Sequence, residues 1–161
     1  MAVVEVKING LAVDAQAKSH VVILKEKDGE RVLPIWIGPA EAQAIARELA
    51  GQRFQRPLTH DLIASIVEGL KARVTRVVIS ELKDNTFFAQ LLVDRDGAVV
   101  VIDARPSDSL AVALRCGADI FVNEKLLSEA AEEEPTEEEK AQELRKFLEN
   151  LDPEDFGRYD P

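Results

Sequence analysis

The chain has 161 residues, of which 46% are hydrophobic, and this is enough for one ordinary domain with a buried core. It contains one cysteine, Cys116, and no run of 18 apolar residues, which excludes a disulfide-stabilised scaffold and a membrane-spanning helix, so we expect a soluble cytoplasmic protein. The net charge of −10 is uneven: residues 1–128 carry 16 Lys and Arg against 17 Asp and Glu, whereas residues 129–161 carry 4 against 13. We therefore expect a near-neutral domain over 1–128 and an acidic linker with a C-terminal helix over 129–161.

The first third of the chain predicts an antiparallel meander. Residues 3–8 alternate apolar and polar side chains, which is typical of a half-buried strand, and Asn9-Gly10 then favours a turn. Residues 20–25 and 31–37 flank Asp28-Gly29 and read as a hairpin.

Two helices follow this meander. Pro39 comes after Gly38 and suits the first turn of a helix, and apolar residues then recur at helical spacing until Gly51. Thr59 is expected to cap the second helix, whose apolar stripe is Leu62, Ile63, Ile66, Val67 and Leu70.

Three successive strands are predicted at residues 74–82, 86–93 and 98–102. The middle one is apolar at both odd and even positions, so we expect it to lie centrally with both faces covered by helices. A helix from about residue 107 to Gly117 and a short strand at 120–122 complete the domain. The predicted class is α+β: a mixed, largely antiparallel sheet with helices packed on it. In the acidic tail, Thr136 and Glu139 form a capping-box pattern before an apolar stripe at Leu144, Phe147, Leu148 and Leu151.

The turn at residues 103–108 has the densest polar chemistry in the chain. Asp103 and Asp108 are carboxylates of the kind that bind Mg²⁺ together with phosphate oxygens, and Arg105 is suited to hold a phosphate. A purely structural reading is also open at this point, and residue types alone favour it. In that reading Ser107 caps the helix, Asp108 complements the helix dipole and Arg105 pairs with Asp103.

Two further segments carry candidate residues. His60 is a potential general base or metal ligand, with Asp61 beside it to fix its tautomer or bind metal, although a solvated position in a first helical turn explains both. Lys83 suits a phosphate, and Asp84-Asn85 suits a tight turn. The two histidines have no zinc-finger spacing, and the sequence has no Gly-rich phosphate loop or Gly-x-Ser-x-Gly motif.

Four stretches in order, RVLPIWIG at 31–38, RPLTHDL at 56–62, LKDNTFFA at 82–89 and DARPSDSLAVAL at 103–114, resemble the bifunctional nuclease family over roughly residues 1–128. Family members that have been tied to an activity degrade both RNA and DNA. The resemblance implies a compact α+β domain, a nucleic-acid substrate and self-association into a homo-oligomer.

From this resemblance and the residue chemistry we expect a nuclease with little sequence preference that uses Mg²⁺ or Mn²⁺. The expected catalytic residues are Asp103, Asp108, His60 and Arg105. The expected substrate-binding residues are Arg56, Lys83, Asn85 and Ser107, and the expected metal ligands are Asp103, Asp108, Asp61 and Asp84. The alternative is a non-catalytic module that binds an anion or a protein, with the acidic tail as a regulator.

Overall fold

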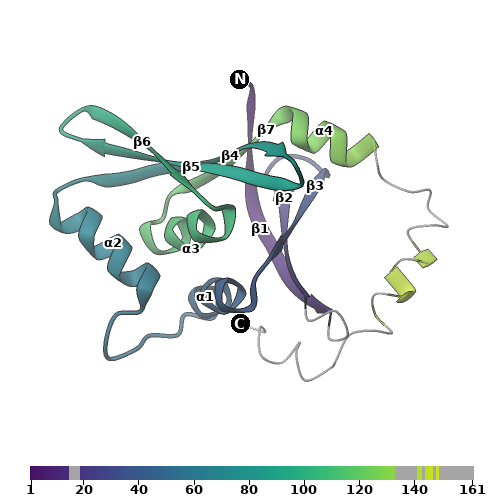
Figure 1. Cartoon of the computed structure of the whole chain (residues 1–161), viewed down its shortest axis with the longest axis horizontal. Coiled ribbons are helices and arrows are strands. Elements are labelled where there is room, and N and C mark those ends of the chain that lie inside the picture. The colour runs from purple at the N-terminus through teal and green to yellow at the C-terminus, as the bar shows by residue number, and fades with distance from the viewer. Residues whose placement is uncertain (15–18, 133–140, 143, 147, 149–161) are drawn as a thin grey trace.

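The computed structural model describes residues 1–14, 19–132, 141–142, 144–146 and 148. Within these residues, seven strands form one sheet in the order β3-β2-β1-β7-β4-β5-β6 (Figure 1). The strands are β1 (Val3–Asp14), β2 (Ser19–Glu26), β3 (Val32–Ile37), β4 (Arg73–Lys83), β5 (Thr86–Arg95), β6 (Ala98–Ala104) and β7 (Asp119–Asn123). The helices of the domain are α1 (Pro39–Leu49), α2 (Thr59–Gly69), α3 (Pro106–Cys116) and α4 (Glu124–Glu132).

The sheet joins two antiparallel units through a strand from late in the chain. β1, β2 and β3 form the predicted meander, and β4, β5 and β6 form a second one. β7 lies between them, antiparallel to β1 and parallel to β4. The α+β class with a mixed, largely antiparallel sheet is confirmed.

α3 is the helix around which the core is built. It packs against β4 and β5 and also contacts α1 and α2, whereas α4 lies against β3 and β7, away from the other helices (Figure 1). Leu110 and Ala111 of α3 are fully buried, and Gly117 ends the helix in the left-handed conformation with φ of 65°. The larger buried side chains of this core include Leu24, Ile45, Val77, Ile79, Val122 and Leu127.

The turn predicted at Asn9-Gly10 is absent from β1, which continues to Asp14. The pairing of β1 with β2 shifts register between Ile8 and Gly10, so these residues form an irregularity within the strand. The apolar residues after Gly10 then continue to pair with β2, with Leu11 opposite Val22. The alternation of residues 3–8 was therefore only the first half of a longer strand.

The expectation that residues 86–93 are covered on both faces is wrong. In β5, Ala89, Leu91 and Val93 are buried beneath helices, but the residues between them are only partly buried. The next strand, β6, is the edge of the sheet, and residues 98–103 are exposed on both faces. Apolar composition alone therefore did not distinguish a covered strand from an uncovered one.

The predicted boundary at residue 128 falls inside α4. Arg31, just before β3, donates hydrogen bonds to Glu124 at 2.6 Å and to Ser128 at 3.2 Å, which fastens this helix to the domain. The capping box at Thr136 and Glu139 lies outside the described residues. Among the residues that are described, no helix has the length and apolar character needed to span a membrane.

Candidate functional site

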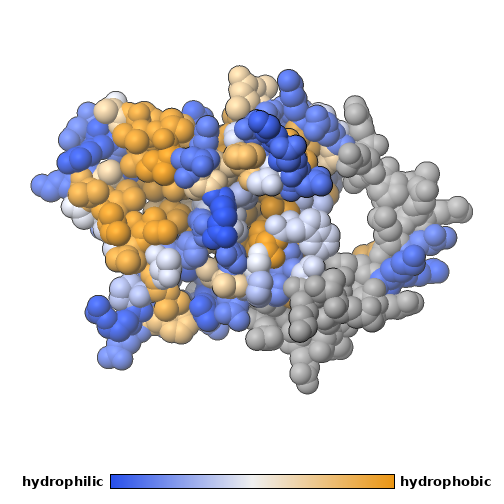
Figure 2. Space-filling model, in the orientation of Figure 1, coloured by the Kyte–Doolittle hydropathy of each residue, from blue (hydrophilic) through white to orange (hydrophobic). Residues whose placement is uncertain are grey.

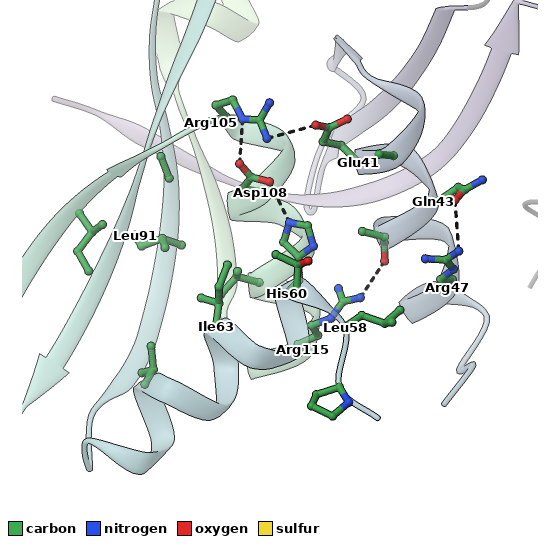
Figure 3. Close-up of a pocket in the computed structure, with 18 of the residues that line it drawn as sticks. Glu41, Gln43, Arg47, Leu58, His60, Ile63, Leu91, Arg105, Asp108 and Arg115 are labelled. Carbon is green, nitrogen blue, oxygen red and sulfur yellow. Dashed lines mark hydrogen bonds and ion pairs between the residues drawn. The ribbon is translucent and has the colours of Figure 1, made fainter. Parts of the chain in front are cut away.

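A pocket of about 950 Å³ opens between α1, α2, α3 and the edge formed by β5 and β6 (Figure 3). Its walls are apolar on the strand side, where Leu91, Val93 and Ile102 lie, and polar on the helix side. The polar wall consists of Glu41, Arg47, His60, Arg105, Asp108 and Arg115.

Three helices begin at this pocket, and each contributes a side chain from its first turn. Glu41 comes from α1, His60 from α2 and Asp108 from α3. Pro39 starts α1 and Pro106 starts α3. Proline is tolerated there because the first amide of a helix has no partner within the helix.

The N-cap residues of these three helices, Gly38, Leu58 and Arg105, cap none of them through their own side chains, and at α2 the Asp61 side chain instead accepts a hydrogen bond from the Leu58 amide. The capping roles expected for Thr59 and Ser107 are wrong, because the N-cap residues are Leu58 and Arg105. Thr59 and Ser107 already lie within the helices, which begin at Thr59 and Pro106. The positive ends of three helix dipoles thus come together, and this favours an anion such as a phosphate.

His60 and Asp108 form the central contact of the site. His60 Nε2 lies 2.9 Å from Asp108 Oδ1, and Arg105 Nε donates to Asp108 Oδ2 at 2.9 Å (Figure 3). Arg105 also forms an ion pair with Glu41 at 3.2 Å. The pairing of Arg105 with Asp103 that the structural reading proposed is therefore replaced by a chain of contacts across all three helices.

The charge on Asp108 is set by these partners. Burial raises the pKa of Asp108, but hydrogen bonds from Arg105 and His60 outweigh it, so the pKa of this carboxyl lies below its ordinary value. Because an ionised carboxylate can only accept a hydrogen bond, Nε2 of His60 carries the proton and donates to Asp108, which fixes the tautomer of the ring. Nδ1 of His60 forms no hydrogen bond with another described residue. That nitrogen is then the one with a lone pair for a proton from a reactant.

Arg115 holds the three helices at these positions. Its side chain is 6% exposed and donates to Asp61 Oδ1 at 2.7 Å, to the carbonyl of Ala111 at 2.8 Å and to the carbonyl of Ala44 at 3.1 Å. Asp61 also accepts a hydrogen bond from the Leu58 amide at 2.9 Å. That bond and the Arg115 guanidinium lower the pKa of Asp61 against the opposing effect of burial. Asp61 is thus engaged in a structural ion pair.

The structure gathers only part of the predicted site. Asp103 lines the rim of the pocket, but in the β5–β6 register it pairs with Gln90, whereas Ile102 pairs with the buried Leu91. Because side chains alternate along a strand, Asp103 points to the opposite face of the sheet from Ile102 and Leu91. Asp103 and Asp108 are therefore not directed at one point.

The other predicted residues lie around the pocket or away from it. Asn85 and Ser107 line a smaller pocket of about 320 Å³ on the other side of Arg105. Lys83 and Asp84 are in the exposed hairpin between β4 and β5, and Arg56 is exposed in the loop before α2. Neither of these two pockets is lined by Lys83, Asp84 or Arg56.

The carboxylates predicted as metal ligands do not form a donor set in the described part of the chain. No group of three or more His, Cys, Asp or Glu side chains in those residues is placed to hold a metal ion. Asp61 is bound to Arg115, both oxygens of Asp108 have partners, and Asp84 is not among the residues that line the pocket. These residues do not fit a shared divalent cation.

Sequence reasoning missed Glu41 and Arg115. Both belong to helices that were expected, but nothing in the spacing shows that α1 and α3 pack so that Glu41 contacts Arg105 and Arg115 reaches Ala44. The available signal was a basic residue, Arg115, in the last turn of an apolar helix, because such a residue needs an acceptor once it is buried. Cys116, which follows Arg115, is half-buried and burial raises its pKa, as expected for a packed thiol.

The fold and the pocket define a class: an α+β domain with an imidazole–carboxylate pair at an anion-favouring pocket. The bifunctional nuclease domain matches residues 22–135 of the chain. An uncharacterised protein of Mycobacterium tuberculosis is 40% identical over 162 residues, which cover 94% of this chain and 97% of that protein. The chain belongs to the bifunctional nuclease domain family.

Plant members of the family are more distant. Bifunctional nuclease 1 of Arabidopsis thaliana is 28% identical over 114 residues, which are 68% of this chain and 35% of the plant protein. Bifunctional nuclease 1 of Oryza sativa subsp. japonica is 26% identical over 114 residues, covering 68% of this chain and 34% of the rice protein. The match therefore spans about a third of these plant proteins, and each is similar to this chain in its domain only.

Proposed function

We propose that this chain is a nuclease that hydrolyses phosphodiester bonds in RNA and DNA with little sequence preference. The observation that carries the proposal is the contact between His60 and Asp108 in a pocket where three helices begin. The names of the plant relatives, which call them bifunctional nucleases, support the choice of nucleic acid as substrate.

In the proposed reaction, Nδ1 of His60 takes a proton from the attacking water while Asp108 stabilises the imidazolium that forms. The water oxygen bonds to phosphorus, the bond to the leaving oxygen breaks, and the ring returns its proton to that oxygen. Arg105, whose side chain is 66% exposed, stabilises the added negative charge on the phosphate oxygens. The helix N-termini add to this effect.

No step of this scheme is carried by a metal ion, because the described carboxylates do not converge. The dependence on Mg²⁺ or Mn²⁺ expected from the sequence stays a prediction. A cation used in this pocket would be one that enters it bound to the phosphate of the substrate. The cytoplasmic location also stays a prediction.

The test is cleavage of single-stranded and double-stranded RNA and DNA by the purified full chain, with the Asp108→Asn variant beside it. Wild type is expected to cleave at least one RNA and one DNA substrate, and Asp108→Asn is expected to lose most of this activity, because an amide does not stabilise the imidazolium. Absence of cleavage of all four substrates, with or without added Mg²⁺ and Mn²⁺, would overturn the proposal. Cleavage that Asp108→Asn leaves unchanged would overturn the role of the pair.

A further inference from the structure

The edge strand β6 exposes four consecutive branched aliphatic side chains. Val99, Val100, Val101 and Ile102 are between 42% and 59% exposed, although β6 is fully paired with β5 on its inner side. Val99 and Val101 lie on one face of the sheet and Val100 and Ile102 on the other, because side chains alternate. The described chain therefore leaves both faces of this strand and its outer backbone edge uncovered.

The apolar surface continues from β6 onto α2. Leu62, Ile66 and Leu70 follow one another at intervals of four residues on this helix and are 51% to 55% exposed. Figure 2 shows hydrophobic residues gathered over the arm that carries β5 and β6 and along the neighbouring α2. A monomer rarely leaves a contiguous apolar surface of this kind in water.

The opposite edge strand of the sheet, β3, has features that hinder pairing with a further strand, and β6 lacks them. β3 has Pro34 in the strand, alternates buried and exposed residues, and is contacted by α4. β6 has no proline, no charged residue between positions 98 and 102, and no register shift against β5. Natural edge strands that lack such features are usually paired with another strand.

We infer that β6 is the site at which two copies of this chain pair, antiparallel, to form one continuous sheet. A two-fold axis perpendicular to the sheet keeps the faces of both copies aligned, so residues opposite each other must lie on the same face. With Val100 on the axis, Val99 lies opposite Val101 of the second copy and Ala98 lies opposite its Ile102. Every residue of the run 98–102 then meets an apolar residue.

The second copy also lies beside the pocket. Ile102 and Ala104 line its strand side, so a strand added to β6 runs along its open edge, and the α2 helices of both copies lie on the same face of the joined sheet. Nucleic acid is a poor occupant for this edge, because the run 98–102 offers no cationic side chain to phosphates.

The test measures the mass of the full chain in solution by light scattering over a dilution series. Wild type is expected at twice the chain mass of 17.8 kDa. The Val99→Lys, Val101→Lys double variant is expected at the single mass with unchanged circular dichroism, since both positions are exposed and lie outside the pocket lining. The matched control is Trp36→Lys on β3, which is 62% exposed and should leave the dimer intact.

A second variant reports on the register without adding charge. In a Cys116→Ser background, Val100→Cys is expected to give a covalent dimer with a short thiol-reactive cross-linker, and Trp36→Cys is expected to give none. A monomeric wild type at all concentrations, a dimer that persists in the double lysine variant, or a lack of cross-linking through Val100→Cys would each overturn the inference. These measurements do not depend on catalysis, so failure of the nuclease proposal leaves them interpretable.

Discussion

His60 Nε2 lies 2.9 Å from Asp108 Oδ1, and the residue after His60, Asp61, accepts a hydrogen bond from Arg115 at 2.7 Å. These two adjacent contacts join the first turn of α2 to both ends of α3. They hold the imidazole at the pocket through residues that are distant in the sequence: Asp108 is 48 residues from His60, and Arg115 is 54 residues from Asp61. The candidate catalytic pair is therefore positioned by rigid elements and not by a loop.

Replacing Arg115 should destabilise the domain. Arg115→Ala leaves the Asp61 carboxylate without its guanidinium partner and removes the hydrogen bonds from that guanidinium to the carbonyls of Ala44 and Ala111, so we expect a loss of about 3 kcal/mol in the free energy of unfolding. Urea unfolding measures this quantity. The matched control is Arg53→Ala, whose side chain is 74% exposed and pairs with Glu48. It should cost less than about 1 kcal/mol, and equal effects of the two substitutions would contradict the role given to Arg115.

The pKa of Asp61 predicts how stability changes in acid. Its pKa is lowered in the folded chain from the ordinary 3.8, so its stabilising effect is complete above that value and is lost as the pH falls through the lower folded pKa. The difference in melting temperature between wild type and Asp61→Asn should stay constant above about pH 5 and shrink below about pH 4. Thermal unfolding over a pH series measures this difference. A difference that keeps its full size at the acid end would show that the ion pair is not its source.

The sequence predicts most elements of the fold but not which strands are covered. Alternation and turn residues located the meander, and helical spacing located α1, α2 and α3, because these signals are local. Whether a strand is covered depends on where the helices lie in the folded chain, which no local pattern specifies. β6 has the composition of a core strand, yet it lies beyond the helix layer, so its aliphatic side chains are exposed.

The sequence identified residue types that belong to the candidate site, but it did not show which of these residues contact one another. His60, Arg105 and Asp108 were identified from polar chemistry in helix starts, and the structure places them in contact. Asp103 was grouped with Asp108 because they are five positions apart, but strand alternation turns it to the other face. Glu41 and Arg115 depend on the packing of α1 against α3, which no local pattern specifies.

A chelator distinguishes the two accounts of the chemistry. The His60–Asp108 account predicts that cleavage persists in EDTA, because no described donor set holds a cation. The expectation from the sequence predicts that EDTA abolishes cleavage and that Mg²⁺ or Mn²⁺ restores it. The measurement is the initial rate on one labelled RNA and one labelled DNA, with Asp84→Asn as a control for a carboxylate outside the pocket. Loss in EDTA with recovery on adding metal would contradict the metal-independent scheme.

The most direct test of the central claim compares initial cleavage rates of wild type, His60→Gln and the control Asp84→Asn on the same RNA and DNA. Glutamine keeps a polar side chain that can still contact Asp108 but has no group that titrates near neutral pH. We predict that His60→Gln lowers the rate by about 10²-fold or more on both substrates, as loss of a general acid–base group does. Asp84→Asn should match wild type, with all three chains unfolding at similar temperatures. A folded His60→Gln variant that cleaves RNA and DNA at the wild-type rate would contradict the account.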